Sequence, residues 1–163
     1  MFDPAWRSGL LAAAFSLGLA APGAAGLGGG ETNRQSAKRI GHATLSQIRI
    51  NGHKTRAVVR RGRNVTVKFD LRSDSSAWCP KCTNQIIVGY ARQTRRGLER
   101  MAGGKCVYSA SGPRHRNNIQ VRLKAPGEPG RYRVIVSAPQ AYNCVRALKW
   151  RGRPKSIAAL KVR

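Results

Sequence analysis

Residues 119–136 read Ile-Gln-Val-Arg-Leu-Lys-Ala-Pro-Gly-Glu-Pro-Gly-Arg-Tyr-Arg-Val-Ile-Val, and this stretch decides the fold. Apolar side chains occupy every second position of 119–123, which is the period of a β-strand with one buried face. Residues 126–130 hold two prolines and two glycines, a strong turn signal. The alternation resumes over 132–136, so we predict two β-strands joined by a tight turn.

Strand patterns of the same kind recur along the rest of the chain. Residues 65–71 alternate between apolar and polar side chains, and residues 85–91 form a short continuous apolar run. No segment shows a helical stripe, although residues 93–101 are compatible with a short turn. Seven or eight short strands separated by turns predict an all-β fold, a single antiparallel β-sandwich. The remaining strands are expected at 45–50, 107–110 and 157–162.

Two passages resemble a known class of sandwich. The corner at 123–134 resembles the strand–corner–strand passage of immunoglobulin-like and fibronectin-like domains, where a tyrosine after a Pro/Gly turn begins the penultimate strand. Residues 59–67 are similar to the glycine-containing turn into the second strand of that class. The resemblance covers about 43–163 and implies an immunoglobulin-like sandwich. The Cys-Pro-Lys-Cys at 79–82 is also similar to a motif of uncharacterised secreted bacterial proteins, which implies no activity.

The first residues predict export. Arg7 precedes an apolar run at 10–21 that ends in small residues, the pattern of a cleavable secretory signal covering 1–25. An uncleaved membrane anchor is the alternative, but a spanning helix needs about 20 apolar residues. Residues 26–42 are Gly-rich and polar, so we expect a flexible leader before a domain at 43–163. The mature protein is expected in the periplasm or outside the cell.

The charge balance is extreme. The chain has 31 Lys and Arg against 6 Asp and Glu, a formal net charge of +25. Such an excess favours affinity for polyanions, and arginine suits phosphate, sulfate and carboxylate because its planar fork bonds two oxygens at once. The expected partners are therefore acidic glycans, lipopolysaccharide, phospholipid head groups or nucleic acid. The alternative is a structural or protein-interaction domain whose charge is only solubilising.

The basic residues gather in predicted loops, which are the usual place for binding surfaces on a rigid sandwich. Trp150 lies among cations, where an indole can stack on bases or sugar rings or can cover the edge of the core. The candidate binding residues are Arg60, Arg61, Arg63, Arg95, Arg96, Arg114, Arg116, Lys149, Trp150, Arg151 and Arg153.

Four cysteines lie in the expected mature chain: Cys79, Cys82, Cys106 and Cys144. An even number in an exported protein predicts two disulfides, and three pairings are possible. In an immunoglobulin-like sandwich, the loops of Cys79/Cys82 and of Cys144 lie at the same end. The resemblance thus makes a bridge from one of that pair to Cys144 plausible, with Cys106 left for the other.

The Cys-x-x-Cys could also have a chemical function, as a redox site or as part of a zinc site, instead of a structural role. A thioredoxin-like redox site needs a helix after the first cysteine, but 83–88 predict a strand. A zinc site needs a second close pair, and Cys106 and Cys144 are far apart in sequence. The acidic and histidine residues form no catalytic constellation, and no small-molecule substrate is evident. We therefore expect a non-enzymatic binding module with no metal and no cofactor, with a thiol redox or zinc protein as the further alternative.

Overall fold

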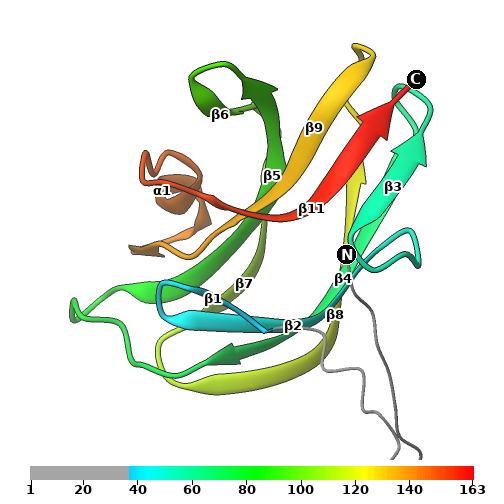
Figure 1. Cartoon of the computed structure of the whole chain (residues 1–163). Helices are drawn as coiled ribbons and strands as arrows, with labels where there is room; N and C mark the ends of the chain where they lie inside the picture. Colours follow the sequence, from blue (N-terminus) through cyan, green and yellow to red (C-terminus); the bar gives the residue numbers. More distant parts are fainter. Residues whose placement is uncertain (1–36) are drawn as a thin grey trace, which may run out of the picture. The chain divides into compact units, whose positions relative to one another are not determined.

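The computed structural model describes residues 37–163, which form an all-β sandwich of two sheets (Figure 1). This confirms the predicted fold class. The predicted signal segment, 1–25, and most of the predicted leader, 26–36, lie outside the described residues. Within 37–163, no helix is long and apolar enough to cross a bilayer.

The first sheet contains four antiparallel strands in the order β1-β2-β4-β8. Strand β8 is an edge strand, and it contains the first half of the stretch that predicted the fold. The bounds are β1 Lys38–Ile40, β2 Ala43–Ile50, β4 Asn64–Ser73 and β8 Arg114–Lys124.

The second sheet is built around β5 and has the order β10-β5-β9-β11-β3, with β6 and β7 also paired to β5. All its pairings are antiparallel except that of β3 with β11, which is parallel. The bounds are β3 Arg56–Val59, β5 Thr83–Thr94, β6 Gly97–Arg100, β7 Lys105–Ala110, β9 Gly130–Ser137, β10 Gln140–Ala141 and β11 Lys155–Val162.

The core lies between the sheets and follows the predicted alternation. On β4, the apolar members of 65–71 are buried, and on β9 Tyr132, Val134 and Val136 face them as part of the same core cluster. Full burial of one such side chain contributes about 1.5–3 kcal/mol. The corner between β8 and β9 is closed by Tyr132, whose hydroxyl donates to the Glu128 carbonyl oxygen at 2.9 Å.

The second sheet is also covered on its outer face. Residues 84–91 of β5 are all buried, and this face is covered in part by helix α1 (Cys144–Leu148), which contacts β5 and β7, and in part by Gly104, which lies against Gly89 and Ile87. This explains why residues 85–91 are a continuous apolar run rather than an alternating one. Asn143 caps the helix, since its side chain accepts from the Arg146 backbone N–H at 3.0 Å.

The strand boundaries differ from expectation at three places. The described residues form eleven strands rather than seven or eight, because the four short strands β1, β3, β6 and β10 are not among the predicted ones. Strand β1 lies within the predicted leader of 26–42, so regular structure begins at Lys38. Residues 93–101, expected as a short turn, instead form most of the β5–β6 hairpin.

Candidate anion-binding surface

The structure distributes the predicted binding residues over four places. Arg60, Arg61 and Arg63 surround the β3–β4 turn, and Arg95 and Arg96 form the β5–β6 turn. Arg114 and Arg116 lie on β8, and Lys149–Arg153 follow α1. The β3–β4 turn and the β5–β6 hairpin lie at opposite edges of the second sheet.

The residues after α1 line one groove. It has a volume of about 870 Å³ and lies between β6 and the segment that follows the helix. Residues 98–102 form one wall and residues 148–154 form the other. Four of the predicted residues line it: Lys149, Trp150, Arg151 and Arg153. We call it the basic groove.

Arg100 joins the two walls of the basic groove. Its guanidinium donates to the Trp150 carbonyl oxygen and to the Ser137 hydroxyl, both at 2.7 Å. Burial lowers the pKa of Arg100, and the charge of Arg151 lowers it further. The sequence alone does not single out Arg100, because its contact with Trp150 joins residues that are 50 positions apart.

The charge of the basic groove is not neutralised by its own wall. Arg100, Lys149, Arg151 and Arg153 have no carboxylate partner in the described chain, and Glu99 is the single acid in the lining. The two ion pairs formed among residues 37–163, Arg72–Asp74 and Arg92–Glu128, lie elsewhere. Unpaired guanidinium groups keep their donors available for an external anion.

Trp150 is held in place by its neighbour. Its side chain is 37% exposed, and a Cβ at Gly152 would overlap the indole ring. Glycine is therefore the residue that permits the backbone of 152 to lie against the ring. The indole is positioned among cations and remains partly open to solvent, which suits stacking on a ring of a ligand.

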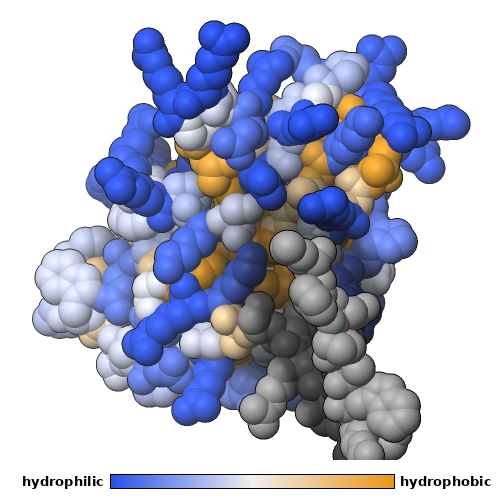
Figure 2. Space-filling model, viewed as in Figure 1, coloured by the Kyte–Doolittle hydropathy of each residue, from blue (hydrophilic) through white to orange (hydrophobic). Residues whose placement is uncertain are grey.

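The other basic groups are less enclosed. At the β3–β4 turn, the Arg61 N–H donates to the Arg163 carbonyl oxygen at 2.9 Å, which brings the chain end beside this turn. A Cβ at Gly62 would lie 3.8 Å from the Lys124 side chain, so this lysine also lies there. Hydrophilic side chains project over most of the face in Figure 2, with apolar surface visible between them. The predicted basic residues are thus distributed over several separate turns and strands of the domain.

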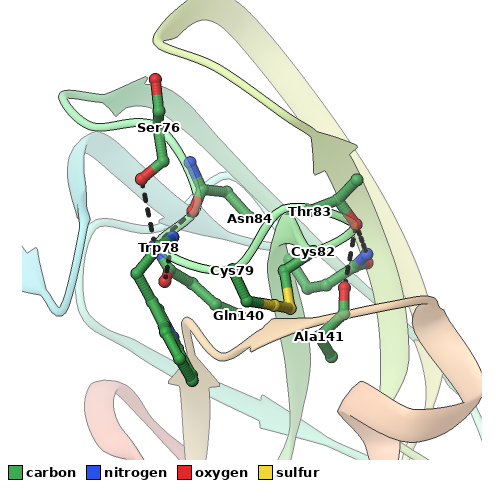
Figure 3. The surroundings of a disulfide bond; sticks show 9 residues. Ser76, Trp78, Cys79, Cys82, Thr83, Asn84, Gln140 and Ala141 are labelled. Atoms are coloured by element: carbon green, nitrogen blue, oxygen red, sulfur yellow. Dashed lines mark hydrogen bonds between the residues drawn. A yellow bond between two sulfur atoms is a disulfide. The ribbon is translucent and has the colours of Figure 1, made fainter.

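The Cys-x-x-Cys pair is a disulfide at the start of β5. Cys79 is bonded to Cys82, and the Cys82 N–H donates to the Cys79 carbonyl oxygen at 3.0 Å (Figure 3). The bridge to Cys144 that the resemblance made plausible is not formed, because the tight turn brings Cys79 and Cys82 together. The second of the two expected disulfides is also not formed, since Cys106 and Cys144 are free. Strand β5 begins at Thr83, so the helix of a thioredoxin-like site is not formed here.

Cys106 and Cys144 are free thiols in contact with each other. Cys106 lies on β7 and Cys144 begins α1, and the two thiols lie close enough to interact electrostatically. Burial and this contact raise the pKa of Cys106 to about 12, and its thiol also donates to Gln85 Oε1 at 2.9 Å. In the described part of the chain, no three His, Cys, Asp or Glu side chains gather to hold a metal ion.

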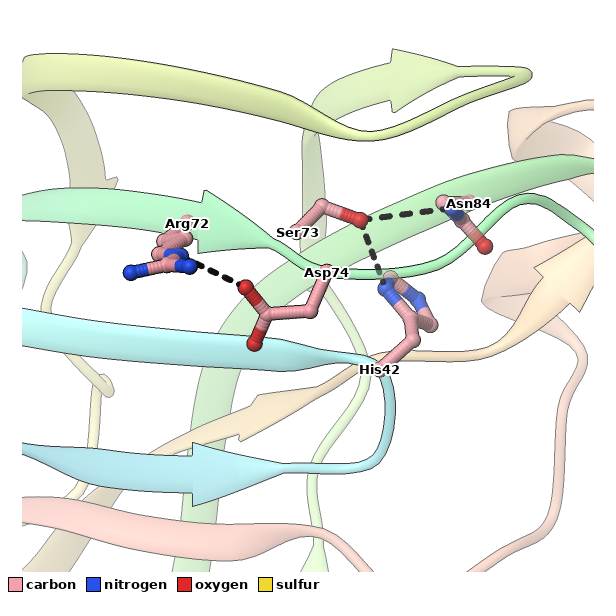
Figure 4. A network of polar contacts seen from close by, with 5 residues as sticks. All are labelled: His42, Arg72, Ser73, Asp74 and Asn84. Atoms are coloured by element: carbon pink, nitrogen blue, oxygen red, sulfur yellow. Dashed lines mark hydrogen bonds and ion pairs between the residues drawn. The ribbon is translucent and has the colours of Figure 1, made fainter.

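A polar network closes one end of the sandwich (Figure 4). His42 Nδ1 and the Ser73 hydroxyl lie 3.3 Å apart, and Asn84 Nδ2 donates to the same hydroxyl at 3.3 Å. Burial lowers the pKa of His42. Asp74 pairs with Arg72 at 2.7 Å instead of with the histidine, so these residues do not form a charge-relay triad.

The sequence matches no protein-family model, and no curated protein matches it significantly. Function is therefore inferred from this chain's own residues and geometry.

Proposed function

We propose that this chain is an exported, non-enzymatic, cationic module that binds anionic polymers or surfaces, with the basic groove as its principal contact. The observation that carries the proposal is the groove itself. Arg100, Lys149, Arg151 and Arg153 line it around the partly exposed Trp150, with no carboxylate partner among the described residues.

The chemistry of the groove fits a polymer with phosphate, sulfate or carboxylate groups. Arginine binds such groups through two parallel hydrogen bonds, and an indole stacks on bases or sugar rings. The basic turns at 60–63 and 95–96 extend the charged surface beyond the groove. Acidic glycans, lipopolysaccharide, phospholipid head groups and nucleic acid all present this chemistry.

The test is binding of fluorescently labelled heparin, a sulfated polysaccharide, at several salt concentrations. The variant Lys149→Gln/Arg151→Gln/Arg153→Gln removes three positive charges from the groove. We expect the slope of log affinity against log salt to fall by roughly two to three, about one for each lost contact. Circular dichroism would verify that the variant is folded.

The matched control removes the same charge elsewhere. The variant Arg60→Gln/Arg61→Gln/Arg63→Gln alters the β3–β4 turn, at the other edge of the second sheet from β6. We expect it to lose much less affinity than the groove variant. Equal losses from the two variants would contradict a groove-centred site.

A second candidate is a structural or protein-interaction domain whose charge only keeps it soluble. The spread of hydrophilic side chains over the face in Figure 2 favours it. Its prediction is weak heparin binding at physiological salt, with no difference between the two triple variants.

The proposal includes an immunoglobulin-like identity for the sandwich. In that class, a tyrosine at the start of a late strand bonds back to the backbone a few residues upstream. The hydrogen bond from Tyr132 to Glu128 has this form. The packing of β2-β4-β8 on β5-β9-β11 supports the same assignment.

Export is supported by the Cys79–Cys82 disulfide, since disulfides persist in oxidising compartments. Mass spectrometry of the protein from its native host tests this part of the proposal. A mature chain beginning near residue 26 is expected, and an intact N-terminus in a cytosolic fraction would contradict it.

A further inference from the structure

A second cleft lies along the open edge of β7. This strand pairs with β5 on one side, and no strand of the described chain pairs with its other side. The cleft has a volume of about 750 Å³ and is bounded by residues 106–111, by 114–116 of β8 and by Cys144. None of these residues lines the basic groove.

Arg114 and Arg116 are exposed residues of β8 that line this cleft. Arg114 is paired with Ser73 and Arg116 with Leu71, and both partners on β4 are buried. Directly paired residues of antiparallel strands project from the same face of the sheet. The two arginines therefore project from the inner face of the first sheet, toward β7. Neither has a carboxylate partner within 37–163.

The wall opposite the arginines contains a buried hydroxyl without a partner. Tyr108 is 7% exposed and lies on β7, and its Oη forms no hydrogen bond with any described residue. Burial raises the pKa of Tyr108, while the charges of Arg114 and Arg116 lower it, which shows that both guanidinium groups lie within electrostatic reach of the phenol. Buried polar groups are nearly always hydrogen-bonded, so an unpartnered hydroxyl needs an explanation.

We infer that this cleft binds a tetrahedral oxyanion, the phosphate or sulfate group of a small ligand, between Arg114, Arg116 and the hydroxyl of Tyr108. The two guanidinium groups can donate up to four hydrogen bonds to the oxygens of the oxyanion, and the tyrosine hydroxyl can donate one more. A carboxylate has only two oxygens, whereas phosphate and sulfate groups present three or more. Because the Tyr108 oxygen is buried in the free protein, neighbouring side chains move when the bound oxyanion completes the hydrogen bonding of Tyr108.

The site is independent of the proposed polymer binding, because it shares no residue with the basic groove. It adds a small-ligand function to the same domain. The two proposals can be tested separately. Heparin affinity measures polymer binding at the basic groove, and the affinity for small anions measures binding at the cleft.

The decisive variant is Tyr108→Phe, which removes one hydroxyl and no charge. Because that hydroxyl has no partner in the free protein, we expect the melting temperature without ligand not to fall. Calorimetric or NMR titration with inorganic phosphate and with sulfate should show about a tenfold loss of affinity, the effect of one charge-assisted hydrogen bond. Heparin affinity should be unchanged.

Two further variants separate a specific site from general charge. Arg114→Gln/Arg116→Gln should abolish phosphate and sulfate binding. Arg95→Gln/Arg96→Gln removes the same charge from the β5–β6 turn and should leave that binding intact. Equal weakening by both pairs, or an unchanged affinity in Tyr108→Phe, would overturn the inference.

The last measurement compares the affinities of the cleft for different anions. Tighter binding of phosphate than of sulfate assigns the site to phosphate esters, and the reverse order assigns it to sulfate esters. Acetate serves as the carboxylate control. Acetate binding as tight as that of both tetrahedral anions, or no binding of either, would contradict the assignment.

Discussion

Tyr132 and Tyr108 are both buried tyrosines, yet they differ in what their hydroxyls do. The Tyr132 hydroxyl bonds to the Glu128 carbonyl oxygen and holds the corner between β8 and β9. That of Tyr108 has no partner among the described residues. The same Tyr→Phe change is therefore expected to lower stability at position 132 and to leave it unchanged at position 108.

Tyr132→Phe should lower the free energy of unfolding by about 1 kcal/mol, because a hydrogen bond at the corner is lost. Urea unfolding followed by circular dichroism measures the loss. Tyr142→Phe is the matched control, since Tyr142 is 64% exposed and its change should have no effect. Equal stability of the Tyr132→Phe variant and the unmodified protein would show that the corner bond contributes nothing.

Gly152→Ala tests the packing of Trp150. The added methyl group would overlap the indole, so Trp150 must move and the basic groove must change shape. We expect a shifted tryptophan emission and up to about tenfold weaker heparin binding, the scale of a lost stacking contact. Gly112→Ala is the control, because a Cβ there meets nothing within 4 Å. Unchanged emission and affinity in Gly152→Ala would argue against a role for the indole.

At the scale of elements, α1 is a small helix that contacts β5, β7 and β10, and one thiol of the helix lies beside a thiol of β7. Cys144 begins the helix and contacts Cys106 on β7, and the basic groove follows immediately after the helix. The two thiols are neighbours across about 40 residues of chain, so a disulfide between them would tie α1 to β7 covalently.

Oxidised glutathione should convert the Cys106 and Cys144 thiols to a second disulfide, releasing two glutathione thiols. The raised pKa of Cys106 leaves little thiolate at neutral pH, so we expect the reaction to accelerate as pH rises from 7 toward 10. A bridge closing a loop of this length contributes roughly 4 kcal/mol in the chain-entropy model.

Peptide mass spectrometry without reductant identifies this bridge, and thermal unfolding measures its stabilisation. Cys106→Ser is the control, because it leaves Cys79–Cys82 intact and removes the second bridge. Two thiols that remain titratable after prolonged oxidation of the native protein would contradict the expectation.

At the scale of the whole molecule, the two sheets are joined at one end by the polar network of His42, Ser73 and Asn84. His42 follows β1, Ser73 ends β4, and Asn84 lies in β5 of the other sheet. Burial lowers the pKa of His42, so the unfolded chain binds a proton there at a higher pH than the folded protein does.

Stability should therefore be complete above about pH 6.5, the ordinary histidine value, and should decrease as pH falls below it. Urea unfolding at intervals between pH 8 and pH 5 measures this dependence. In His42→Gln, the decrease over this interval should be smaller. The same pH profile in this variant and in the unmodified protein would assign the effect to other groups.

The sequence by itself determined the class of fold, because alternation with period two is a local property. Residues 65–71 show which side chains face the core, and 126–130 show where the chain must turn. The extreme charge is equally visible without a structure. These properties depend on side-chain type and near neighbours, so they do not need the path of the whole chain.

Only the tertiary structure decided which distant residues meet. Arg100 joins Trp150 across 50 residues, and Cys79 bonds to Cys82 rather than to Cys144. Helix α1 was not predicted, because five residues are too few to show a helical stripe. The inward projection of Arg114 and Arg116 depends on their register against β4. These contacts depend on how distant segments of the chain pack and pair. The sequence of an arginine-rich edge strand does not show which of its side chains project from the inner face of the sheet, because this depends on its pairing with the neighbouring strand.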